Sequence, residues 1–103
     1  MSKNKMVIFK GYAEIVLWNI YGMESGRVKI NVEDIDLVES HRWAYNARSG
    51  ASSTIDGKHI GINRYITSAK DDELVYWLNG DRFDCRRCNL EIKKIKGNRR
   101  KQE

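Results

Sequence analysis

Two cysteines separated by two arginines, Cys85 and Cys88, form the tightest cluster of chemically useful side chains in this chain of 103 residues. A Cys-x-x-Cys spacing suits half of a tetrahedral zinc site or a redox pair. A full zinc site would have to recruit His41 and His59, which lack the usual spacing of paired histidine ligands. We therefore expect two reduced thiols in a turn and no cofactor, with a structural zinc ion as the alternative.

The net charge of +5 is concentrated near the C-terminus. Residues 1–81 hold ten Lys or Arg against eleven Asp or Glu, whereas residues 82–103 hold nine against three. A concentrated basic segment is typical of proteins that bind the phosphate backbone of nucleic acids. A solvated tail that aids solubility, or a tail that contacts an acidic protein, would have the same composition.

Short elements separated by glycine turns must position these residues. Apolar runs and alternation predict strands at 12–19 and 27–32, and acidic residues followed by Ile35 and Val38 predict a short helix at 33–40 with Asn31 near its cap. Asp56-Gly57 predicts a hairpin that joins 53–55 to 59–62. The pattern is that of an α+β fold, and Trp18, Trp43 and Tyr65 stand at positions expected in its core.

Residues 42–48 alternate strictly, which predicts a strand with one aromatic face and one basic face. The aromatic face is Trp43, Tyr45 and Ala47, and the basic face is Arg42, Asn46 and Arg48. An antiparallel ribbon fits the major groove of DNA, where arginine pairs well with guanine and asparagine with adenine. The alternative is an exposed strand that is polar only because its other face belongs to the core.

Three segments resemble the phage and intron HNH homing-type endonucleases. VKINVEDIDLVESHRWAYNAR resembles that family's acidic helix and basic-Trp strand, KHIGINRYI its His-Arg-Tyr strand, and VYWLNGDRFDCRRCNL its nuclease hairpin. The resemblance implies a small antiparallel three-stranded sheet with a short helix, similar to DNA-binding sheets of the plant ethylene-response type, followed by an HNH-like ββα hairpin. One domain over 1–103 would comprise a sheet at about 12–66, a hairpin at about 73–98 and a basic tail at 93–103.

The sequence departs from this family where the chemistry would sit. In those enzymes an Asp binds a divalent cation, the next residue is a His base, and a later Asn completes the metal site. Here Tyr76 and Trp77 replace the Asp and His, Asn63 replaces the His of the middle strand, and Cys85 replaces a hairpin Asn. Indole neither accepts a proton from water nor binds a metal, and phenol titrates near pH 10. We expect no catalysis, and Cys85, Cys88 and Asn98 remain only weak metal candidates.

The expected function is a non-catalytic, HNH-like, nucleic-acid-binding protein of phage or mobile-element origin that acts by occupancy. An alternative is an anti-CRISPR or other anti-defence inhibitor that binds a CRISPR effector or another host nuclease, and a second alternative is a residual metal-dependent HNH endonuclease. Tyr76 and Trp77 are expected to contact a partner. The residues expected to bind DNA or RNA are Arg42, Asn46, Arg48, Arg64, Arg82, Arg86, Arg87, Lys93, Lys94, Lys96, Arg99 and Arg100.

The sequence also gives an expected location. Its longest apolar runs are far shorter than the roughly 18 residues that span a bilayer. The basic start of the chain is followed only by the short apolar stretch 6–9, which is too short for a secretory leader. We therefore expect a cytoplasmic protein in a bacterial host, without a membrane partner.

Overall fold

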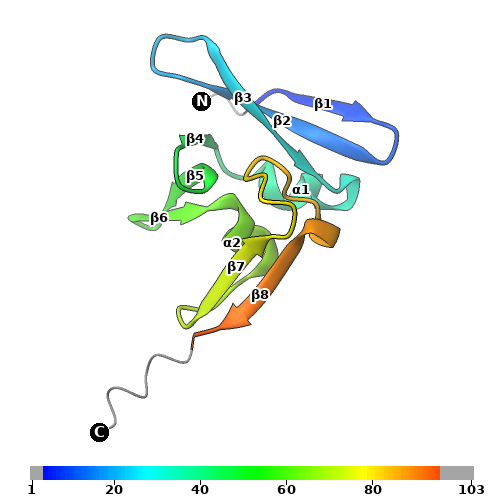
Figure 1. The fold of residues 1–103 in the computed structure, drawn as a ribbon. Coiled ribbons are helices and arrows are strands. Elements are labelled where there is room, and N and C mark those ends of the chain that lie inside the picture. Colours follow the sequence, from blue (N-terminus) through cyan, green and yellow to red (C-terminus); the bar gives the residue numbers. More distant parts are fainter. Residues whose placement is uncertain (1–3, 96–103) are drawn as a thin grey trace, which may run out of the picture.

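The computed structural model describes residues 4–95 and has an α+β fold of small antiparallel sheets and short helices (Figure 1). In chain order the elements are β1 (Met6–Phe9), β2 (Tyr12–Trp18), β3 (Glu24–Ile30), the 3-10 helix η1 (Val32–Asp34), α1 (Ile35–Val38), β4 (Ala44–Asn46), β5 (Gly50–Ile55), β6 (Lys58–Gly61), α2 (Ile62–Thr67), β7 (Glu73–Trp77), the 3-10 helix η2 (Arg87–Asn89) and β8 (Leu90–Lys94). The described residues contain no helix that is long and apolar enough to cross a membrane.

The first sheet has the strand order β1-β2-β3. Strand β2 supplies most of its buried side chains, and Val28 and Ile30 of β3 lie beside them. Two details differ from the sequence-based expectation. The short apolar stretch Met6–Phe9 forms an additional strand that pairs with β2, and β3 starts and ends earlier than the predicted 27–32 because Val32 already belongs to η1. The short helix expected after β3 is confirmed as η1 and α1.

The second sheet, β4-β5-β6, is separate from the first. A single three-stranded sheet over residues 12–66 was therefore the wrong grouping: the five strands of this region, together with β1, form two three-stranded sheets. The chain between them turns through η1 and α1 and then buries Trp43, whose indole Nε1 donates to the carbonyl of Val38 at 2.8 Å. Strand β4 consequently pairs only with β5, and its regular part is three residues long instead of the predicted 42–48.

The segment Ile62–Thr67 is a helix, α2, and not the strand that its resemblance to the family's His-Arg-Tyr strand predicts. Its β-branched and aromatic residues favour a strand, but Ile62, Asn63 and Ile66 are all buried. Burial at i, i+1 and i+4 suits one face of a helix, whereas a strand would turn Asn63 away from Ile62. Ser68 ends the helix in the left-handed conformation, with φ of 57°.

Strands β7 and β8 form a third, two-stranded sheet, joined by residues 78–89. Figure 1 shows this yellow-to-orange connection rising from the hairpin to the region where the first sheet, α1 and the second sheet meet. The helix expected to complete a ββα hairpin, together with Asn98, lies outside the described residues. The core contains β2, β3, α1, Trp43, Ala51 and α2, and the partly buried Trp77 and Phe83 pack against it.

Candidate nucleic-acid interface

The residues that carry the resemblance to the nuclease hairpin form one hydrogen-bonded cluster in the junction loop, defined as residues 79–89. The buried carboxylate of Asp84 accepts from the Arg86 guanidinium at 2.7 and 2.8 Å and from the Asn79 amide at 3.2 Å. Asn89 donates to the Asn79 side chain and to the Asp84 carbonyl, both at 2.9 Å. The hydrogen bond from Arg86 holds the pKa of Asp84 below its ordinary value, so the carboxylate is charged at neutral pH.

The junction loop is joined to the first sheet by backbone and side-chain contacts. The Lys29 N–H donates to the Phe83 carbonyl at 2.7 Å, and the Cys85 N–H donates to the Lys29 carbonyl at 2.8 Å. The Arg87 guanidinium holds the buried carboxylate of Asp34 at 2.8 and 2.9 Å, and this contact raises the pKa of Arg87. The side chain of Asn31, expected as a helix cap, accepts from the Arg87 N–H at 2.7 Å instead.

The same loop also contacts the second sheet. The Arg82 side chain donates to the Ala47 carbonyl, and the rings of Phe83 and Tyr45 stack with centroids 6.2 Å apart. Gly50 lies so close that a Cβ there would be 2.5 Å from the Arg82 carbonyl oxygen. The segment that resembles a nuclease hairpin thus connects all three sheets, which is a structural role for its turn and arginines.

Tyr76 and Trp77, expected as a joint contact for a partner, face opposite sides of β7. The Trp77 indole is half-buried against the core and its Nε1 donates to the Cys85 sulfur at 3.5 Å. The Tyr76 ring is exposed, with Lys93 Nζ 5.9 Å from its centroid. Successive side chains on a strand alternate in direction, so these two cannot form one patch. Trp77 and Cys85, two of the positions at which the sequence departs from the hairpin it resembles, contact each other beneath the loop.

The two cysteines have different environments. Cys85 is fully buried, and burial raises the pKa of its thiol to about 12, whereas Cys88 is exposed. A thiol that stays protonated is neither a good nucleophile nor a ready metal ligand. Within residues 4–95 no group of three or more His, Cys, Asp or Glu side chains is arranged to hold a metal ion. Of the weak metal candidates, Asn98 lies outside the described residues.

Five of the predicted nucleic-acid contacts are occupied within the protein. Arg82, Arg86 and Arg87 bind the groups described above, and Arg64 donates to the carbonyls of Glu73 and Lys70 at 2.6 Å each. Asn46 accepts from the N–H groups of residues 48 and 49 and donates to Ser52, so it shapes the β4–β5 turn and is not available to read adenine. These side chains therefore have partners within the protein, although Arg82 and Arg87 are also exposed; whether they contact nucleic acid stays a prediction.

The remaining described candidates are Arg42, Arg48, Lys93 and Lys94. Lys94 makes only an exposed ion pair with Asp72 at 3.4 Å, which is worth little in water. Arg42 and Arg48 are exposed, and their guanidinium groups make no hydrogen bond or ion pair within the described part of the chain. Lys96, Arg99 and Arg100 lie outside it. Arg42 and Arg48 are therefore the predicted residues best able to meet a ligand.

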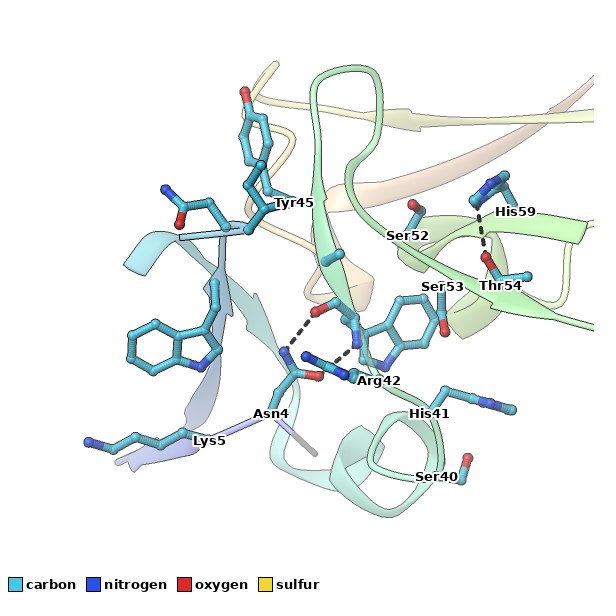
Figure 2. Close-up of a pocket in the computed structure, with 15 residues that line it drawn as sticks. Asn4, Lys5, Ser40, His41, Arg42, Tyr45, Ser52, Ser53, Thr54 and His59 are labelled. Carbon is cyan, nitrogen blue, oxygen red and sulfur yellow. Dashed lines mark hydrogen bonds between the residues drawn. The ribbon is translucent and has the colours of Figure 1, made fainter. Parts of the chain in front are cut away.

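Arg42 lies in a groove of about 910 Å³ between the end of the first sheet and strands β4, β5 and β6 (Figure 2). Lys5, Trp18 and His59 also line this groove, and no Asp or Glu does. Asn4 joins the two sides, since its amide donates to the carbonyls of Val16 and Trp43 at 3.0 and 2.8 Å. The groove is an open, cationic and partly aromatic surface.

The sequence did not reveal this groove. Trp18 was expected in the core, but it is 42% exposed: it is the last residue of β2, and the pairing with β3 shifts register between the buried Leu17 and Trp18. His41 and His59 were treated as unrelated, yet both line the groove. The continuous apolar run 15–18 gives no local signal that Trp18 is exposed; the polar Asn19 after it marks only the end of the strand.

Comparison with known proteins adds no relative: no family model, no curated protein and no solved structure matched this chain. The likeness to HNH homing-type endonucleases stays a prediction from the three sequence segments.

Proposed function

We propose that this chain is a non-catalytic, HNH-like protein of phage or mobile-element origin that binds nucleic acid and acts by occupying its target. The observation that carries this proposal is the groove, whose lining includes Lys5 and Arg42 and no carboxylate. A cationic concave surface without acidic residues attracts phosphate groups. Arg48, exposed on the turn after β4, is a further cation outside the groove lining.

The absence of catalysis in this proposal rests on the junction loop. Trp77 occupies the position of the family's base, and its indole packs against Cys85 instead of facing a ligand. Asp84 and Arg86 neutralise each other, so neither offers a charge for a metal or a scissile phosphate. The loop keeps the hairpin in shape, and binding is assigned to other residues.

Titration of labelled nucleic acid at several salt concentrations tests this function. We expect the logarithm of the affinity to fall linearly with the logarithm of the salt concentration, and Arg42→Ala and Arg48→Ala each to reduce the slope by about one unit. Lys10→Ala, an exposed lysine in the β1–β2 turn, is the matched control. No measurable binding to duplex DNA, single-stranded DNA or RNA at low salt would refute the proposal.

A second candidate is an inhibitor that binds a CRISPR effector or another host nuclease. The turn between β2 and β3 favours it, because Ile20, Tyr21 and Met23 are 90%, 77% and 58% exposed. Exposed apolar side chains on a protruding turn are typical of protein contacts. If this candidate is right, the protein inhibits cleavage by a purified CRISPR effector and Tyr21→Ala weakens inhibition while nucleic-acid binding is unchanged. An effector that cleaves at its normal rate, with no complex formed, excludes it for that effector.

A further inference from the structure

The size of the groove limits which form of nucleic acid can enter it. At about 910 Å³ it falls in the range of small-ligand sites, about 300–1,000 Å³, which hold unstacked groups and not the flank of a duplex. In a duplex the faces of the bases are covered by their neighbours, whereas the bases of a single strand can be splayed out onto protein side chains. A concave site of this size therefore favours a flexible strand.

Trp18 supplies the aromatic surface that such a strand needs. Its indole lines the groove and is 42% exposed, although Leu17 and Val16 before it are buried. Within residues 4–95 this ring makes no hydrogen bond and no aromatic contact, in contrast to Tyr45, which stacks on Phe83. Aromatic side chains beside a positively charged groove are the usual platform on which proteins stack the bases of single strands.

The positively charged side chains of Lys5 and Arg42 line the same groove as the Trp18 ring. Figure 2 shows Lys5 on one side, Thr54 and His59 on the other, and Arg42 between them. Thr54 Oγ1 and His59 Nδ1 lie 3.2 Å apart and form a polar wall, and the hydroxyl of Ser53 lies nearby in the lining. Lysine and arginine bind backbone phosphates, and hydroxyl and imidazole groups can bind base edges or sugars.

We infer that the groove between the first and second sheets binds single-stranded nucleic acid, with a base stacked on Trp18 and neighbouring phosphates at Lys5 and Arg42. This inference rests on the proposed function and specifies its ligand. The shared chemistry is an unpaired base next to a phosphodiester, which both single-stranded DNA and RNA supply. The affinity for a strand in the groove should then exceed the affinity for a duplex of the same sequence.

Fluorescence anisotropy with three labelled probes tests the inference: a 12-nucleotide single-stranded DNA, the RNA of the same sequence, and the DNA duplex. At one salt concentration we expect at least one single strand to bind about tenfold or more tighter than the duplex. Trp18→Ala should weaken that binding by about 5- to 150-fold, and Trp18→Phe should restore part of it. The DNA and RNA arms identify which strand the groove prefers.

Tyr76→Ala is the matched control, because Tyr76 is also 42% exposed but lies on β7, outside the groove. It should leave the affinity unchanged, and thermal melts should show that both alanine variants are folded. Tighter or equal binding of the duplex, or the same loss for Tyr76→Ala as for Trp18→Ala, overturns the inference. Salt-dependent duplex binding that is insensitive to Trp18→Ala would overturn the single-strand site and leave the proposed function standing, whereas no binding of any probe removes both.

Discussion

The junction loop and the groove are both rich in arginine or lysine, yet these cations serve different purposes. In the loop, the guanidinium groups of Arg86 and Arg87 face the buried carboxylates of Asp84 and Asp34. In the groove, Lys5 and Arg42 have no carboxylate among the lining residues. The loop belongs to the segment whose sequence resembles a nuclease hairpin, and the groove is formed by residues from separate segments of the chain. We infer that neighbouring charge, more than residue type, decides whether a cation stabilises the fold or remains available to a ligand.

The two regions should therefore respond differently to substitution. Removing an ion pair from the loop should lower the free energy of unfolding, since the loop joins three sheets. Removing a charge or ring from the groove should lower affinity and leave stability nearly unchanged, because surface substitutions away from such contacts usually change it by about 0.5 kcal/mol or less. Substitutions in the loop test the first expectation, and substitutions in the groove test the second.

Asp84→Ala should have the largest effect. The carboxylate is 2% exposed and binds Arg86 and Asn79, so its loss leaves several donors without an acceptor. We expect a loss of about 3 kcal/mol in the free energy of unfolding, at the low end for buried pairs because Arg86 is partly hydrated. Chemical denaturation measures it. Asp71→Ala, an exposed carboxylate, should cost almost nothing, and equal effects would contradict the assigned role of the loop.

Acid should weaken the same ion pair. The hydrogen bond from Arg86 lowers the pKa of Asp84 below its ordinary value of 3.8, which is the value expected in the unfolded chain. The stabilisation is thus complete above that value and is lost as the pH falls through the lower folded pKa. Denaturation between pH 2 and 6 should show wild type losing more stability in this window than Asp84→Asn. Parallel pH profiles would mean that Asp84 does not titrate in the way its contacts imply.

Gly50→Ala should have the next largest effect, because it pushes the second sheet away from the junction loop. Gly50 has a φ of +81° and no room for a Cβ, whereas Gly57 has a φ of +80° and nothing within 4 Å of the added atom. In both variants the left-handed backbone of alanine costs about 1 kcal/mol of stability. Only Gly50→Ala adds a steric clash, with the Arg82 carbonyl. We expect a total loss of about 2–3 kcal/mol for Gly50→Ala. Equal thermal shifts in the two variants would show that the close approach is unimportant.

The sequence predicted the strand β2, most of β3, the short helix after β3 and the Asp56-Gly57 hairpin, since these depend on local apolar patterns and turn residues. It predicted a strand where the structure has the helix α2. The β-branched residues of this segment favour a strand, and its buried residues recur at helical spacing. It also merged two sheets into one, because local periodicity identifies strands and does not say which of them pair: β3 and β4, separated by η1 and α1, belong to different sheets.

The site was harder to predict than the fold. Arg64, Arg86 and Arg87 were expected to bind phosphate, but their partners are a pair of carbonyls and two buried carboxylates; one of these, Asp34, is 53 residues away from Arg87. The groove combines residues from 4–5, 18–20, 40–45, 52–54 and 59, so no sequence window contains it. Arg42 was predicted to lie on the face opposite to Trp43. The structure has Trp43 buried and Arg42 exposed.

A pair of arginine substitutions compares the two regions most directly. Arg87→Ala leaves the buried Asp34 without its guanidinium partner and should cost about 1–2 kcal/mol of stability, with little change in affinity. Arg42→Ala should have the opposite profile: unchanged stability, and nucleic-acid affinity lower by a few-fold at low salt. Measuring both quantities on both variants is decisive, since two similar profiles would mean that the regions do not divide their roles.

Chemical labelling of the cysteines should perturb the protein least. It distinguishes the buried Cys85 of the junction loop from the exposed Cys88. With a thiol reagent near pH 8, native protein should react at Cys88 alone, because Cys85 is buried and burial raises the pKa of its thiol to about 12. Cys88→Ser should therefore remove fast labelling, and denaturant should restore it. Slow reaction at Cys85 would then report opening of the junction loop. Asp84→Ala should accelerate that reaction and Trp18→Ala should not, because only the first of these residues holds the loop closed.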